Sequence, residues 1–271
     1  RTMAQSNTKQ AWLPRDCEIL DNPVGTACGF VVSHPASHGQ SRLFFTPGVP
    51  FEFKQMVREQ ILPRLKALAG EETYTELRRF YTFGISESAL SDKLDAAPWP
   101  AGIELGYRSS MPLIELKLIG HSASAADMDA AEARLLGEIT PWLVGQGNEE
   151  PAQQILSLLG ARPLYLQEGE SRGALLAMCH PHPGLEASFS HNLPSELDQL
   201  TGGGQEPCLT IGNAGPGGVP LLLCADGQRI GQQVKLSHPD PESARRILAF
   251  AALDMLRRHL QGLPVLADYL T

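Results

Sequence analysis

The chain has 271 residues, of which 42% are hydrophobic and 19% charged, and its formal net charge at pH 7 is −8. This composition is that of a globular protein and excludes disordered and fibrous classes. Negative charge is spread over both halves of the sequence, which lacks the concentrated Lys and Arg of a phosphate-backbone binder, so we expect no nucleic-acid partner.

The cysteines indicate a reducing compartment. They are odd in number and never form a C-x-x-C pair, which is typical of free thiols; they are Cys17, Cys28, Cys179, Cys208 and Cys224. The sequence shows no apolar run of about 18 residues and no hydrophobic leader. We therefore expect a cytoplasmic protein with no membrane partner. Because the first residues resemble the middle of a domain, we also expect that the natural protein has a further N-terminal portion before them.

The first segment, to about residue 69, predicts two short strands and a helix. The apolar runs Phe30–Val32 and Leu43–Phe45 suit buried strands. A helix should begin near Pro50 and bend or end at Pro63, because proline lacks the N–H that a helix interior needs. We expect its apolar face to have lost its cover; that face runs through Phe53, Met56 and Ile61.

The middle segment predicts a small α/β unit of strand, helix, hairpin and helix. In chain order these are a strand Leu77–Phe83, a helix capped by Ser86, strands Ile103–Tyr107 and Leu113–Leu118, and a helix Asp127–Ile139. Glu115 and Lys117 alternate with apolar residues, which predicts that one face of the second hairpin strand is exposed to solvent.

A polar, glycine-bearing stretch at Gly145–Glu150 predicts a domain boundary. Beyond it we expect helices Ala152–Leu159 and Ala174–Cys179, and strands Leu164–Gln167, Cys208–Ile211 and Leu221–Cys224. The last element is a long helix with Asp240 as its cap and Pro241 at its first position.

Two loops near the start are rich in backbone groups. They are Asn22–Gly29, which includes Gly25 and Thr26, and Pro47–Pro50, which includes Gly48. The second leads into a helix N-terminus, whose free N–H groups and positive dipole end suit a phosphate. The alternative is two structural turns.

The order of motifs through residues 1–140 resembles the CinA family of competence/damage-inducible proteins. Asn7, Gln10–Ala11, Asn22–Gly29, Pro47–Glu52 and Leu62–Leu65 are similar to the end of that family's molybdopterin-binding-like (MoCF) domain. Phe83–Ser88 is similar to the F-G-x-x-E-S of its KH-like linker domain. The resemblance implies a metal-dependent ADP-ribose pyrophosphatase, but the acidic, glycine-rich segment that would hold the metal has no match here.

A second glycine-rich stretch, Gly212–Gly218, follows a predicted strand. It is neither a dinucleotide fingerprint nor a P-loop. It resembles the T-G-x-A-G-P-x-G-G loop of the CinA C-terminal domain, which in active members is a nicotinamide mononucleotide amidase. The resemblance implies nucleotide contacts at Gly212, Gly215 and Gly218, and a purely structural role is the alternative.

The catalytic residues of that amidase are not matched. Aligned without a gap, the signature A-E-S-C-T-G-G corresponds to Glu168–Ala174, which places Glu170 where the family has its nucleophilic serine. The downstream Y-S-N-x-x-K segment corresponds to Phe189–Pro194, so Pro194 replaces the lysine. Because acyl transfer needs a nucleophile and a group that activates it, we expect no amidase activity.

Ser171 is an outside candidate for a nucleophile. Gly169–Gly173 is a literal G-x-S-x-G between a predicted strand and a predicted helix, the context of a nucleophile elbow. Against this, the domain is small, the partners of a triad show no distinctive spacing, and Ser171 lies one position past the family's nucleophile. The alternative is that Ser171 caps the helix.

Two further groups of residues have competing interpretations. Cys179, His180 and His182 could supply three metal ligands, but they lack a fourth ligand and the usual spacing, so we expect no metal site. The arginines at the two ends of the final helix indicate either a solvated face or a nucleotide or subunit contact; they are Arg245, Arg246, Arg257 and Arg258.

Together these features predict an α/β (α+β) protein of three units. They are a MoCF-type tail at residues 1–69, a KH-like unit at 70–147, and an amidase-like sheet domain flanked by helices at 148–271. We expect a homodimer without a cofactor that binds a small nucleotide-like ligand and is not an active enzyme. The alternative is a nicotinamide mononucleotide amidohydrolase, or an ADP-ribose pyrophosphatase in the intact protein.

Overall fold

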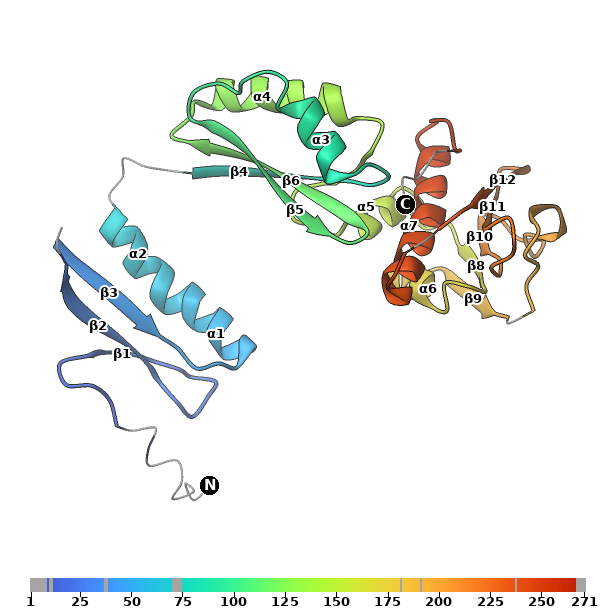
Figure 1. Cartoon of the computed structure of the whole chain (residues 1–271). Coiled ribbons are helices and arrows are strands. Elements are labelled where there is room, and N and C mark those ends of the chain that lie inside the picture. Colours follow the sequence, from blue (N-terminus) through green and yellow to red (C-terminus); the bar gives the residue numbers. More distant parts are fainter. Residues whose placement is uncertain are drawn as a thin grey trace. The chain divides into compact units, whose positions relative to one another are not determined.

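The computed structural model describes residues 9, 12–36, 39–69, 75–180, 182–190, 192–236 and 238–266. Contacts divide the chain into two compact units, Arg1–Tyr74 and Thr75–Thr271. Three sheets and several helices (Figure 1) confirm the mixed α/β class. Some residues used in the sequence comparison lie outside the described ranges: Asn7, Gln10, Ala11, Pro181 and His191.

The first unit is an antiparallel sheet with one long helical segment. The strands, in the order β1-β2-β3, are β1 (Glu18–Leu20), β2 (Gly29–Ala36) and β3 (Gly39–Phe45). The helical segment consists of α1 (Pro50–Met56), a π-helical turn (Val57–Ile61) and α2 (Leu62–Ala69). Pro63 is the second residue of α2, and its missing N–H removes one helical hydrogen bond at the end of the π-helical turn. The helical segment is thus irregular just before this proline and continues as α2 beyond it.

The expectation that the helix has lost its cover is wrong for two of its three residues. Met56 and Ile61 are only 2% and 8% exposed, because they pack against Leu20 and Val31 of the sheet. Phe53 is 46% exposed. The two apolar residues Met56 and Ile61 do lie on a buried face of the helix, and the short strands β1 and β2 cover that face.

The second unit contains a four-stranded antiparallel sheet in the order β5-β6-β4-β7. Its strands are β4 (Thr75–Thr82), β5 (Ile103–Ser110), β6 (Leu113–His121) and β7 (Leu143–Gln146). The helices α3 (Glu87–Leu94) and α4 (Ala125–Ile139) share a core with it that includes Phe80, Leu116 and Leu135. Ser86 caps α3 as predicted, through the N–H of Ala89. β7 overlaps the stretch Gly145–Glu150, which was expected to be a domain boundary.

Glu115 on β6 does not lie on a wet face. It is 6% exposed, and its carboxylate lies 3.2 Å from Arg79 and 3.6 Å from Arg108, on the two neighbouring strands. Because β6 is flanked on both sides, these long side chains cover the residue between them.

A five-stranded sheet in the order β12-β11-β10-β8-β9 forms the rest of the second unit. Its strands are β8 (Leu164–Glu168), β9 (Leu185–Phe189), β10 (Cys208–Ile211), β11 (Val219–Ala225) and β12 (Gln228–Val234). β8 is parallel to both β9 and β10, while β10, β11 and β12 run antiparallel. The sequence did not predict the edge strands β9 and β12, whose residues are mostly exposed or half-buried.

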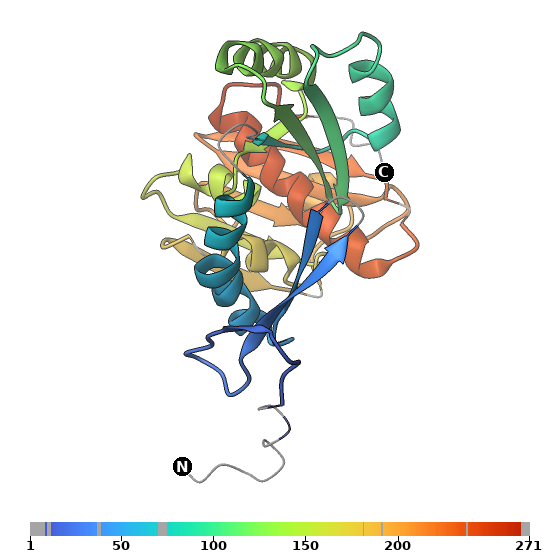
Figure 2. The ribbon, with the colours of Figure 1, turned by 90° about the vertical axis from the view of Figure 1, so that its left-hand side faces the viewer.

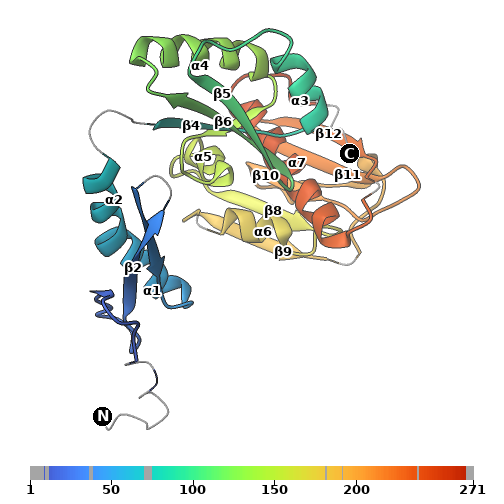
Figure 3. The same cartoon turned by 60° about the vertical axis from the view of Figure 1, so that its left-hand side comes forward.

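Helices pack on one face of this sheet. They are α5 (Pro151–Ser157), α6 (Ala174–Cys179) and α7 (Pro241–Leu260) (Figure 3), and Figure 2 shows α7 crossing the strands. As predicted, Asp240 caps α7 by accepting the Ser243 N–H at 2.8 Å. The Phe83 and Phe250 ring centroids lie 4.9 Å apart, which joins the four-stranded sheet to α7. No helix among the described residues is long and apolar enough to cross a membrane.

Candidate functional site

Three segments that resemble family motifs converge at one end of the five-stranded sheet. They are the signature turn (residues 168–173, between β8 and α6), the segment 189–195 after β9, and the glycine-rich loop (residues 212–218, between β10 and β11). β8, β9 and β10 are parallel neighbours, so their carboxyl ends lie at the same edge. Backbone hydrogen bonds join the segments: Gly169 N to Ile211 O (2.8 Å), Glu170 N to Gly212 O (3.1 Å), Ser190 N to Glu168 O (3.1 Å) and Asn213 N to Pro194 O (3.2 Å).

The carboxylate of Glu168 fills the N-terminus of α6. It accepts the N–H groups of Gly173 (3.1 Å), Leu175 (3.1 Å) and Leu176 (2.7 Å), and Glu168 itself is 1% exposed. The remaining N–H at this helix start, that of Ala174, donates to Ser171 O at 3.0 Å. A helix N-terminus attracts an anion because of its free N–H groups and its dipole. Here the chain supplies that anion itself.

Ser171 belongs to the same capping arrangement. It is 0% exposed, and its hydroxyl donates to the Glu168 carboxylate at 2.5 Å. A nucleophile elbow instead lifts its hydroxyl into a cleft. Ser171 therefore supports the Glu168 cap, whereas its own side chain is not the cap of α6, whose flanking N-terminal residue is Gly173.

Glu170 connects the signature turn to the glycine-rich loop. It is half-buried, and its carboxylate accepts the Ala214 N–H at 3.3 Å. Pro194 likewise has a structural contact, because its carbonyl accepts the Asn213 N–H. The two residues at the places of the nucleophile and the lysine therefore both hold the glycine-rich loop.

The backbone of the glycine-rich loop is bonded within the chain. Gly212 N donates to Pro220 O at 2.9 Å, and Gly215 and Gly218 exchange two hydrogen bonds of 2.9 and 3.0 Å. N–H groups used in this way are not directed at a ligand, whereas a phosphate cradle needs them free.

Close packing explains why two positions of the glycine-rich loop, Gly212 and Gly218, are glycines. Gly218 has a φ of +112°, and a Cβ on it would collide with the carbonyl oxygen of Val234. A Cβ on Gly212 would collide with the carbonyl oxygen of Pro194. These contacts favour the structural interpretation of the loop.

The other expected contact residues lie in the first unit. Asn22 donates from Nδ2 to Glu52 at 2.9 Å, in the first turn of α1, and its Oδ1 accepts the Gly25 N–H at 3.1 Å. Gly25 has no room for a Cβ beside Glu52, whereas Thr26 and Gly48 are exposed. Asn22 and Gly25 are thus brought together, and a carboxylate already lies beside them.

Comparison with known proteins shows the family. The CinA-like proteins of Shewanella amazonensis and Shewanella loihica are each 34% identical to the chain over 313 residues, which cover 99% of the chain and 73% of each relative. The CinA-like protein of Shewanella pealeana is 35% identical over 316 residues, with the same coverage. The chain belongs to the CinA-like family.

The aligned stretch is longer than this CinA-like chain, so the relatives carry residues within it that the chain lacks. No family model matches the chain.

The cysteine and histidines considered as metal ligands do not converge in this CinA-like chain. Cys179 is 0% exposed, and burial together with the Glu168 charge raises the pKa of its thiol to about 12. His180 is exposed, and His182 hydrogen-bonds the Arg162 carbonyl at 2.7 Å. Within the described part of the chain, no group of three or more His, Cys, Asp or Glu is placed to hold a metal.

The arginines near the end of α7 are not a solvated face. Arg257 and Arg258 both donate to Asp254, which is 1% exposed, with Nε–Oδ distances of 2.6 and 2.8 Å. Arg245 and Arg246, at the start of the helix, are half-buried and exposed. Sequence reasoning missed both Asp254 and Glu168. The signal for Glu168 was an acidic residue a few positions before a helix start, where a carboxylate is favoured.

Proposed function

We propose that this CinA-like protein does not hydrolyse amides and instead acts as a nucleotide-binding or structural protein of nucleotide metabolism. The observation that carries the proposal is the filled start of α6. Glu168 occupies the only helix N-terminus at the signature turn, and the buried Ser171 hydroxyl is bonded to it. A substrate carbonyl would therefore find the Ser171 hydroxyl buried and bonded and the N–H groups at the start of α6 already used, whereas acyl transfer needs an available nucleophile and donors for the oxyanion.

The wider organisation is also part of the proposal, and the family resemblance supports it. We assign residues 1–69 to the end of a MoCF domain, 70–147 to a KH-like domain and 148–271 to an amidase-like domain. The protein would be a homodimer in the cytoplasm, a reducing compartment that suits its five free cysteines. A nucleotide-like ligand would use the exposed backbone around Thr26 and Gly48, because the hydrogen-bonding groups of the glycine-rich loop are used within the chain.

Ammonia release from nicotinamide mononucleotide tests the absence of amidase activity. We expect purified protein to release no more ammonia than a blank, while nicotinamide mononucleotide or ADP-ribose raises the unfolding temperature in a concentration-dependent way. Turnover of about 1 s⁻¹, within the usual enzyme range, would show that the amidase-like domain is active.

A fluorophosphonate probe separates the proposal from the alternative in which Ser171 is the nucleophile. We expect no covalent labelling of the native protein, because the hydroxyl is buried and hydrogen-bonded. Labelling that disappears in Ser171→Ala would favour the hydrolase instead.

A further inference from the structure

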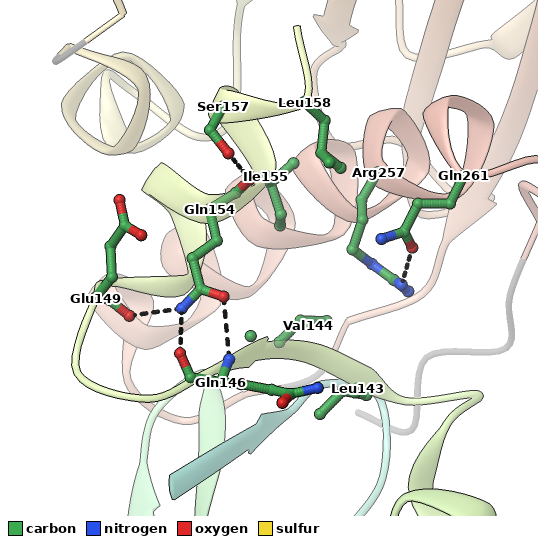
Figure 4. A pocket seen from close by; sticks show the side chains of 11 residues that line it. Leu143, Val144, Gln146, Glu149, Gln154, Ile155, Ser157, Leu158, Arg257 and Gln261 are labelled. Carbon is green, nitrogen blue, oxygen red and sulfur yellow. Dashed lines mark hydrogen bonds between the residues drawn. The ribbon is translucent and has the colours of Figure 1, made fainter. Parts of the chain in front are cut away.

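A cavity of about 380 Å³ lies away from the signature turn, between β7, α5 and the last turns of α7. Figure 4 shows its lining. Small-molecule sites in proteins usually have volumes of about 300–1,000 Å³. This cavity is therefore large enough for a small metabolite.

Arg257 enters the cavity from α7 with part of its guanidinium unused. The residue is 3% exposed, and it donates from Nε to Asp254 and from Nη1 to Gln261, at 2.6 and 2.8 Å. Its Nη2 is buried and has no hydrogen-bond partner among the described residues. In Figure 4 the guanidinium points into the space between α7 and the strand that carries Val144. A guanidinium has five N–H donors, and leaving one buried and unbonded is costly.

In the described part of the chain, Arg257 and Arg258 form their ion pairs with the same carboxylate. Asp254 is shared with Arg258, so one carboxylate faces two guanidinium groups. Arg258 donates hydrogen bonds from Nη2 to the Pro141 carbonyl (2.8 Å) and from Nη1 to the Pro264 carbonyl (3.3 Å). The excess positive charge is therefore directed into the cavity by Arg257. A buried charge without a full partner destabilises the folded state, and an oxyanion would offset this cost.

The remaining walls fit the carbon body of such a ligand. Leu143, Val144, Ile155 and Leu158 are apolar. Gln154 closes the far side, because its amide bonds the backbone N–H and carbonyl of Gln146 at 3.0 and 2.8 Å. The Glu149 carboxylate lies at that far side, away from Arg257 in Figure 4.

We propose that this cavity binds the carboxylate or phosphate group of a small metabolite, with Arg257 Nη2 as the charged donor. The site lies in the second unit, and it depends on neither the signature turn nor the proposed loss of amidase activity.

Anion-dependent stability of the intact chain tests the site. Inorganic phosphate and sodium acetate are titrated separately, each against sodium chloride at equal ionic strength, and the unfolding temperature is followed. A ligand that binds only the native state stabilises it in proportion to RT ln(1 + [L]/Kd). We expect a saturable rise with at least one probe, and the stronger probe identifies the group as phosphate or carboxylate. No rise beyond that in chloride for either probe would overturn the proposal.

Gln261→Glu supplies the decisive variant. Gln261 is exposed, so the change should not disturb folding, and the new carboxylate would neutralise Arg257 from within the chain. We expect anion affinity to fall by about tenfold or more, the loss that follows from one charged contact. Gln228→Glu, on an exposed position of β12 outside the cavity, is the matched control and should retain wild-type affinity. An unchanged dissociation constant in Gln261→Glu would also overturn the proposal.

Discussion

At the scale of single residues, two neighbouring glutamates have opposite roles. Glu168 is the last residue of β8 and faces the core, where it caps α6. Glu170, two positions later, is half-buried, and its carboxylate accepts the Ala214 N–H at 3.3 Å. The two residues look alike in the sequence, and only their different burial in the structure distinguishes their roles.

The pair gives a direct stability test. Glu168→Gln places an amide NH2 against helix N–H groups and removes a buried charge that they stabilise. It should lower the free energy of unfolding by about 2–4 kcal/mol. Glu170→Gln keeps an oxygen that can accept the Ala214 N–H and loses only the charge on this long hydrogen bond, so it should cost less than about 1 kcal/mol. Urea denaturation measures both, and equal effects would show that Glu168 is not the principal cap.

The buried thiols should be unreactive. Burial, together with the Glu168 charge, raises the pKa of Cys179 to about 12, and burial raises the pKa of Cys208 to about 11. Since the thiolate is the reactive form, brief iodoacetamide treatment at about pH 8 should spare both in the native state. Cys17 and Cys28, which are half-buried, should be modified first, and all five in the denatured state; mass spectrometry locates the label. Rapid native labelling of Cys179 would contradict its placement in the core.

At the scale of elements, α7 shows the closest agreement between sequence and structure. Its cap and its first-turn proline were both predicted, and the helix spans Pro241–Leu260. Hydrogen bonding from Ser243, first from its side chain and then from its N–H, holds the pKa of the Asp240 carboxyl below its usual value.

The cap predicts how stability depends on pH. A lowered native pKa means that the contribution of Asp240 is complete above its unfolded pKa of about 3.9 and is lost as pH falls through the native value. Asp240→Asn keeps a capping oxygen but cannot titrate. The variant should match the wild type near pH 7, and the wild type should lose stability relative to it below about pH 4. Urea midpoints across this range are the measurement. Asp240→Ala, which loses the cap itself, should be less stable throughout, and parallel profiles for wild type and Asp240→Asn would exclude the linkage.

The edge strands β9 and β12 show why other elements were missed. β9 has four exposed residues of five, and β12 carries mainly polar side chains, so neither gives an apolar alternation. Both strands exist because a neighbouring strand supplies backbone partners along their length. For β9 the partner β8 lies on the other side of α6 in the sequence, so the pairing leaves no local signal, whereas β12 pairs with β11 across the Asp226-Gly227 turn, a hairpin signal that the apolar pattern alone does not carry.

At the scale of the whole molecule, the two compact units differ in the size of their cores. Among the residues of the first unit that the structure describes, the buried hydrophobic core consists of Leu20, Val31, Met56 and Ile61. The second unit buries a far larger set, which extends from Phe83 to α7. Small cores leave a domain only marginally stable.

Fragments test this difference. Residues 75–271 expressed alone should unfold cooperatively near the main transition of the intact chain, because the second unit has its own core. Residues 1–74 alone should unfold at a much lower temperature. Circular dichroism during heating distinguishes the two, and a fragment 75–271 without a cooperative transition would show that the second unit depends on the first.

The sequence by itself determined the α/β class, the family, most core elements and the cap of α7. Local spacing, capping residues and motif order carry that information within a few residues of each other. Only the tertiary structure decided that Glu168 fills the start of α6, that Ser171 is buried, and that Arg257 directs its charge into a cavity. The physical reason is that each of these depends on burial and on partners brought by other elements. A glutamate or an arginine is written with the same letter whether its charged group faces water, a helix N-terminus or a cavity.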